Sequence, residues 1–163
     1  MVLATLLCLA LTCGARGAQD EVSLFDHKGR ATAYINKDTD IYVWDGKPVA
    51  YLVKDNSSTF DIYGFNGKHL GWFTHGIIYD NEGNAVGGTK DAFSSSTELE
   101  PLKGLKKLRS LKDLQELRPL KPRFTLFRKT WSDVPLGVFL RKGVDPGWCV
   151  APAGTGENVH PLR

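Results

Sequence analysis

The chain has 163 residues, which is room for one domain and at most a very small second one. Hydrophobic residues make up 42% of the chain and charged residues 24%, values typical of a soluble globular protein that exclude a wholly disordered one. The formal net charge of +3 does not suggest a dedicated nucleic-acid binder, so we expect no nucleic-acid partner.

Residues 1–18 have the pattern of a secretory signal peptide. The apolar run at residues 2–13 is shorter than the roughly 20 residues that span a bilayer, and small residues follow it at Ala15 and Ala18. We therefore expect an exported protein, periplasmic or extracellular, with no transmembrane span after signal removal. Cleavage would leave Cys149 as the one cysteine, and no internal disulfide. A buried N-terminal helix or strand is the alternative.

Residues 22–93 contain four copies of one β-hairpin pattern: an aromatic residue, Asp or Asn, a turn glycine, and a strand. The turn glycines are Gly29, Gly46, Gly67 and Gly83. Successive turn glycines are 17, 21 and 16 residues apart, and such an internal repeat determines the architecture. Asp45-Gly46 and Asn66-Gly67 predict two-residue hairpin turns with positive φ at both central positions. The first and fourth turns are predicted to be lengthened versions of the same turn.

The second strand of every copy carries a small residue at one equivalent position: Ala33, Ala50, Gly71 and Gly87. The next residue is Tyr34, Tyr51 or Trp72 in the first three copies and Gly88 in the fourth. Because a single hairpin is marginal in water, four must shield one another. The sequence therefore predicts an all-β fold with four hairpins around a pseudo-four-fold axis, aromatic residues in the surrounding layer, and a fourth copy that is covered differently.

Eight leucines recur at every third position from Leu99 to Leu120. In an α-helix each leucine would be displaced by about 60° from the last, so the row would spread around the whole cylinder. An extended polyproline-II conformation, with three residues per turn, keeps them on one edge. Pro101, Pro119 and Pro122 favour this form, although a short helix within residues 105–117 remains open. We predict that residues 94–130 form a polyproline-II-like strap.

The leucine edge of the strap is expected to lie across an apolar face of the hairpin module, because an exposed row of leucines would be a sticky patch. The charge distribution also favours docking of the strap on the module. Residues 22–93 hold nine acidic and seven basic residues, whereas residues 94–163 hold seven acidic and thirteen basic residues, so the two parts attract each other. In a competing interpretation, the basic side chains bind an anionic partner. These side chains are Lys103, Lys106, Lys107, Arg109, Lys112, Arg118, Lys121 and Arg123.

Residues 131–142 are predicted to form a short closing helix with Ser132 as its N-cap. Its apolar face, expected to dock with Trp131, would consist of Leu136, Phe139 and Leu140. Residues 143–163 are rich in Gly and Pro and poor in apolar side chains, so we predict a flexible tail.

The stretches WDGKPVAY at residues 44–51 and FNGKHLGWF at residues 65–73 resemble the bacterial four-fold β-flower family, in which four hairpins are arranged like petals. Family members continue into a Leu-, Lys- and Pro-rich segment and a closing Trp-Ser motif, which correspond here to residues 99–122 and Trp131-Ser132. The resemblance covers residues 22–140 and implies a fold without implying an activity. A weaker resemblance, to choline-binding cell-wall repeats, depends on Gly71-Trp72 alone.

No catalytic, cofactor or metal site is predicted. The four histidines His27, His69, His75 and His160 lack the spacing of zinc ligands. Asp38 and Asp40 lie in the link between the first two hairpins and are expected to be solvated turn formers. Convergence of Asp38, Asp61 or His69 in a concave site would point instead to a hydrolase with a dispersed site.

The sequence thus favours an exported structural or interaction module without catalytic activity or cofactor, with a partner such as an envelope protein. The alternative is a module that binds an envelope polymer, using aromatic faces for a glycan and the basic strap for anions.

Overall fold

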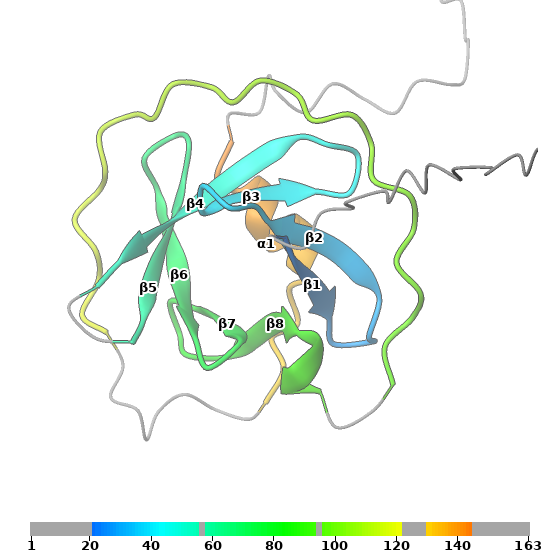
Figure 1. Ribbon diagram of the computed structural model, residues 1–163. Helices are drawn as coiled ribbons and strands as arrows, with labels where there is room; N and C mark the ends of the chain where they lie inside the picture. The colour runs from blue at the N-terminus through cyan, green and yellow to red at the C-terminus, as the bar shows by residue number, and fades with distance from the viewer. Residues whose placement is uncertain (1–20, 56–57, 94–95, 122–129, 145–163) are drawn as a thin grey trace, which may run out of the picture.

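The computed structural model of the chain describes residues 21–55, 58–93, 96–121 and 130–144. Within them, eight antiparallel strands pair in chain order, and the last strand pairs with the first to close a barrel (Figure 1). The strands are β1 (Val22–Asp26), β2 (Ala31–Ile35), β3 (Asp40–Val43), β4 (Pro48–Lys54), β5 (Phe60–Gly64), β6 (His69–Thr74), β7 (Ile77–Asp80) and β8 (Ala85–Thr89). The prediction of an all-β fold built from four hairpins is confirmed.

All four hairpins have the same turn. The N–H of each turn glycine donates to the carbonyl oxygen three residues earlier, at 2.9–3.1 Å, and each of these glycines has a φ of 75–84°. The prediction of two-residue turns at Asp45-Gly46 and Asn66-Gly67 was wrong, because neither Asp45 nor Asn66 has positive φ. Their side-chain oxygens accept the N–H two residues ahead, from Lys47 and Lys68. This bond keeps Asp45 and Asn66 out of the positive-φ region, so each loop is longer than a two-residue turn. A β-bulge in the paired strands accommodates the extra loop residue.

The small residues lie where consecutive hairpins approach each other. Ala33, for example, is opposite Leu24 of its own hairpin and opposite Val43 of the next. A β-carbon added to Gly71 would stand 2.0 Å from the carbonyl oxygen of Tyr79. Ala33, Ala50, Gly71 and Gly87 are all buried. Small side chains at these positions therefore allow the hairpins to close into a barrel, as predicted.

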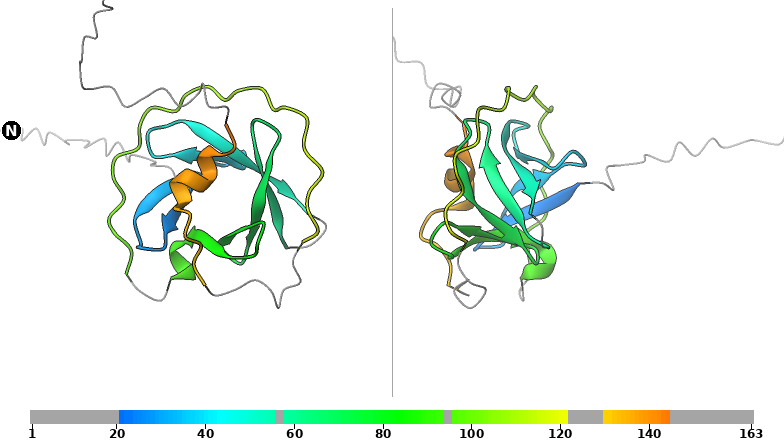
Figure 2. Two further views of the ribbon diagram at one scale, coloured as in Figure 1. Left: turned by 180° about the vertical axis from the view of Figure 1, so that it is seen from behind. Right: turned by 90° about the vertical axis from the view of Figure 1, so that its left-hand side faces the viewer.

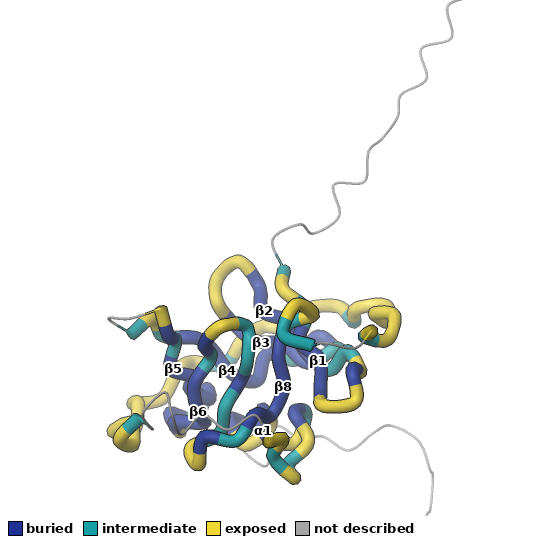
Figure 3. Tube along the Cα trace, turned by 90° about the horizontal axis from the view of Figure 1, so that it is seen from below, coloured by how far each residue is buried: buried dark blue, intermediate teal, exposed yellow. Residues whose placement is uncertain are grey.

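The surrounding aromatic layer is also confirmed, since Tyr34, Tyr51 and Trp72 are at most 2% exposed. The fourth hairpin is covered differently. A β-carbon on Gly88 would lie 3.2 Å from the Ala92 side chain, because the short 3₁₀-helix η1 (Lys90–Ala92) packs over this position. Buried stretches follow the strands, and exposed stretches mark the turns (Figure 3).

The α-helix α1 (Leu136–Arg141) lies across one end of the barrel and packs against β1, β2, β4 and β8 (Figure 2). Its buried residues are Leu136, Phe139 and Leu140, as predicted. The N-cap is Pro135 and not Ser132, whose hydroxyl instead accepts the N–H of Val134. None of the described helices is long and apolar enough to cross a membrane.

Several predictions concern residues outside the described ranges. They include the signal peptide at residues 1–18, Cys149, His160 and all but the first two residues of the predicted tail.

Candidate interaction surface

The strap, described over residues 96–121, follows an arc around the outside of the barrel past successive hairpin turns (Figures 1 and 2). It contains no helix or strand, and its backbone binds to the turns. The N–H groups of Glu98, Lys107 and Glu116 donate to the carbonyl oxygens of Gly29, Gly46 and Gly67, at 2.8–2.9 Å. These donors are nine residues apart, so the turns of the first three hairpins each bind one residue of the strap at nine-residue intervals.

One edge of the strap carries cations onto the barrel wall. The Lys103 ammonium lies 4.7 Å from the ring centre of Tyr34, and that of Lys112 lies 3.8 Å from the ring centre of Tyr51. Such cation–π contacts are favourable where the ring is shielded from water. Further along the same edge, Arg109 pairs with Asp40 at 3.2 Å and Arg118 with Asp61 at 3.0 Å. Two pairs of neighbouring strands, β2 with β3 and β4 with β5, thus each receive a lysine on an aromatic ring of the first strand and an arginine on an aspartate of the second.

A sequence signal for this register exists but is easily missed beside the leucine period. Residues 102–110 read LKGLKKLRS and residues 111–119 read LKDLQELRP, which is a nine-residue repeat. Its lysine and arginine positions are the ones that contact β2 and β3 in one copy and β4 and β5 in the next. The strap repeat is therefore matched to the hairpin repeat.

The leucines face away from the barrel. Their exposed fractions are 91–98%, and they form what we call the leucine belt: Leu99, Leu102, Leu105, Leu108, Leu111, Leu114, Leu117 and Leu120. The prediction that the leucine edge covers the hairpin module was wrong, although the strap does dock on its own module. The barrel wall presents Asp40 and Asp61, which are 2% and 4% exposed and would be costly to bury unpaired. The cationic edge therefore faces the barrel, and the three-residue period places the leucines on a different edge, which faces solvent.

Asp40 itself was assigned incorrectly from the sequence. It is a buried residue at the start of β3, and its carboxylate pairs with Arg109. Its neighbour Asp38 is exposed, as expected for a solvated turn. The partner of Asp40 lies 69 positions ahead in the chain, so local sequence could not reveal its role.

The cationic edge is largely occupied by groups of the barrel. Lys103 and Lys106 pair with Glu21, and their hydrogen bonds lower its pKa although burial opposes that change. Arg118 bridges Asp55 and Asp61, and Lys121 also reaches Asp55. These carboxylates take the place that an external anion would need. Arg123 lies outside the described residues.

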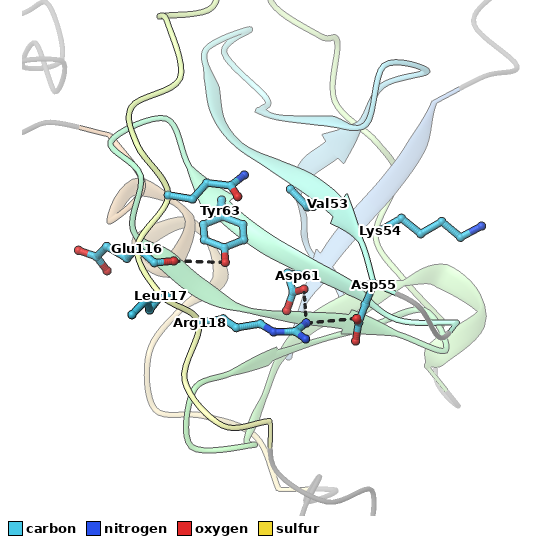
Figure 4. A pocket seen from close by; sticks show the side chains of 9 residues that line it. Val53, Lys54, Asp55, Asp61, Tyr63, Glu116, Leu117 and Arg118 are labelled. Atoms are coloured by element: carbon cyan, nitrogen blue, oxygen red, sulfur yellow. Dashed lines mark hydrogen bonds and ion pairs between the residues drawn. The ribbon is translucent and has the colours of Figure 1, made fainter.

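A shallow pocket between the strap and β4 and β5 contains this bridge (Figure 4). Arg118 points to Asp61 and Asp55 there, and the Tyr63 hydroxyl donates to the carbonyl oxygen of Glu116 at 3.4 Å. These bonds fasten the strap to β5, so the pocket is part of the docking interface.

Asp61 also meets His69, so two of the three residues considered for a dispersed hydrolase site do converge. His69 is buried; its Nε2 lies 3.3 Å from Asp61 Oδ1 and its Nδ1 lies 3.0 Å from Asn81 Oδ1. The Asn81 amide nitrogen donates to the His69 carbonyl, which orients its oxygen toward the ring. Both ring nitrogens of His69 are therefore engaged by side chains of the barrel.

The remaining histidines lie apart from this cluster. His27 is exposed beside Trp131, and His75 lies in the link between β6 and β7 with a φ of 50°. Trp131, which was predicted to dock with α1, stacks on Phe93 with ring centres 5.4 Å apart. Within the described ranges, no three potential metal-ligating side chains gather in one place.

Tyr34 should make the protein sensitive to alkali. Its hydroxyl is buried and has no hydrogen-bond partner among the described residues. Burial, reinforced by the charge of Glu21 and by Tyr42 and Asp45, raises its pKa from 10 to about 12. The neutral phenol is therefore favoured in the folded state, and its contribution to stability is present below about pH 10 and lost as the pH rises toward 12.

We expect Tyr34→Phe to unfold less readily than the native protein above about pH 10, and to be at least as stable at pH 7, where it removes an unsatisfied hydroxyl. The measurement is the free energy of unfolding by urea across this pH range. Tyr51→Phe is the control, because the Tyr51 hydroxyl accepts a hydrogen bond from Gln115 and its loss should cost stability at pH 7. A parallel pH profile for native protein and Tyr34→Phe would contradict the prediction.

Comparison with known proteins agrees with this architecture. Residues 22–140 match the family described as 4-fold beta flower protein, a span that includes all eight strands and most of α1. Neither the curated proteins nor the solved structures contain a significant match. Four equivalent hairpins in a closed barrel, followed by a strap in matching register and a closing helix, account for the whole matched span. The chain belongs to the 4-fold beta flower proteins.

Proposed function

We propose that the chain is an exported interaction module without catalytic activity, whose barrel is a scaffold that holds the leucine belt out to solvent. The observation that carries this proposal is the 91–98% exposure of eight leucines on a backbone that is hydrogen-bonded to the hairpin turns. An apolar patch of this extent on a folded protein marks a contact surface. The pattern of residues 1–18 supports export.

The energetics favour such a role. Burying one leucine side chain is worth roughly 1.5–3 kcal/mol, and the belt offers eight. Its backbone is already ordered by the barrel, so a partner need not supply the free energy of ordering it. The alternative, a module that binds an envelope polymer, has less support, because barrel carboxylates occupy the cations and the strap covers the aromatic wall.

Site-specific photo-crosslinking in the cells that produce the protein tests this proposal. With a photoreactive amino acid in place of Leu108, we expect covalent adducts, because this side chain is 91% exposed on the belt. Lys90 on η1 is also exposed and serves as the control position. Replacing Leu108 should leave the fold intact. As a check, Leu108→Ser should change the free energy of unfolding by less than about 0.5 kcal/mol, because its side chain is not packed against the barrel. Equal adduct yields at the two positions would refute the proposed function.

A further inference from the structure

We infer that the leucine belt pairs with the belt of a second copy of this chain, in antiparallel orientation about a two-fold axis near Ser110. This inference rests on the proposed function, since it names the partner of the same surface. It follows from the regularity of the belt, from the area that can be buried, and from two charges beside the leucines.

The regularity of the belt favours a partner with the same period. With about 3.1 Å per residue in an extended three-fold conformation, leucines at every third position are about 9.3 Å apart. Specific contacts with unrelated proteins usually mix aromatic, arginine and polar side chains, whereas here all eight are leucine. A second copy has the same spacing by construction, so its leucines can insert into the gaps of the first belt.

The area that can be buried sets the strength of the pair. The strap is convex (Figure 1), so two straps can meet only near their centres, where Leu105, Leu108, Leu111 and Leu114 lie. At roughly 100 Å² per leucine, four from each copy remove about 800 Å² of apolar surface from water. Neighbouring polar residues bring the total toward the roughly 1,200 Å² at which specific interfaces begin. We therefore expect a weak, reversible dimer and not an obligate one.

Charge selects the antiparallel orientation. Lys107 and Asp113 are exposed, form no ion pair within the described part of the chain, and stand three residues on either side of Ser110. A two-fold axis near Ser110 brings Lys107 of each copy opposite Asp113 of the other, which gives two ion pairs. Parallel pairing would set like charges against each other. The same symmetry makes the contact self-complementary and therefore closed.

Sedimentation velocity of the full chain, over a wide range of protein concentration, tests the inference. We expect a reversible monomer–dimer equilibrium in the native protein. Leu108→Ser with Leu111→Ser should raise the dimer dissociation constant by about tenfold or more, because four leucines per dimer no longer become buried. Leu99→Ser with Leu120→Ser is the matched control. These leucines are equally exposed but lie at the ends of the arc, so their loss should leave the equilibrium unchanged.

A charge exchange tests the orientation separately. Lys107→Asp should weaken the dimer, and combining it with Asp113→Lys should restore it, because both ion pairs then re-form with opposite polarity. A native protein that stays monomeric at every concentration would overturn the inference. So would equal effects of the central and terminal leucine pairs.

Phosphatidylcholine vesicles distinguish failure of this inference from failure of the proposed function. Binding of a monomeric native protein to these vesicles, lost in Leu108→Ser, would make lipid the occupant of the belt. That result would overturn self-association and leave the interaction module standing. Monomeric protein that neither binds vesicles nor forms adducts at Leu108 in cells would overturn both.

Discussion

Gly67→Ala should release the strap from the third hairpin and lower the free energy of unfolding by about 2 kcal/mol or more. Part of this cost is conformational, because Gly67 has a φ of 78° and alanine is strained in that region. The rest is steric, since a β-carbon there would stand 2.0 Å from the carbonyl oxygen of Leu114 on the strap. Urea titration measures the stability, and the rate of tryptic cleavage within residues 103–118 measures release of the strap.

Gly29→Ala separates the two causes. Gly29 has nearly the same φ, 75°, but its added β-carbon would be 3.4 Å from the nearest strap atoms, which is ordinary contact. We expect this variant to lose stability through strain alone and to keep a protected strap. If trypsin cleaved the strap equally fast in both variants, a clash between the added β-carbon at position 67 and Leu114 would not be the cause of its release.

Leu136→Ala should cost about 3 kcal/mol, because Leu136 is fully buried where α1 closes one end of the barrel. Its side chain lies against Gly87, where an added β-carbon would come within 2.7 Å of it, so the site is tightly packed and cannot collapse around a smaller residue. Thermal or urea unfolding measures the loss.

Val138→Ala, on the same helix, provides the control for this second variant. Val138 is 53% exposed, and truncating it should change stability by less than about 0.5 kcal/mol. Comparable losses for the two variants would mean that α1 does not seal the barrel through Leu136.

The hairpin module could be predicted well because its determinants are local. A glycine with positive φ is required at each turn, and a small residue is required where each second strand meets the next hairpin. Both signals lie within a few residues of the structure they determine, and they recur four times. The turn length was harder to predict. Asp-Gly and Asn-Gly pairs are typical of two-residue turns, but the Asp45 and Asn66 side chains accept backbone N–H groups and stabilise a longer turn.

The candidate site was only half predictable for a related reason. The three-residue period of the strap is visible in the sequence and determines that leucines share one edge and cations another. It does not say which edge faces the barrel. That choice depends on Asp40 and Asp61, which are buried carboxylates in the folded chain and pair with Arg109 and Arg118 of the strap.

By itself, then, the sequence determined the number of hairpins, the positions of their turn glycines and the extended form of the strap, because these follow from backbone sterics and short-range repetition. The tertiary structure decided that cations dock and leucines point to solvent. The physical reason is the free energy of burying a charge: Asp40 and Asp61 require Arg109 and Arg118 beside them, whereas leucines in water cost less than carboxylates buried alone.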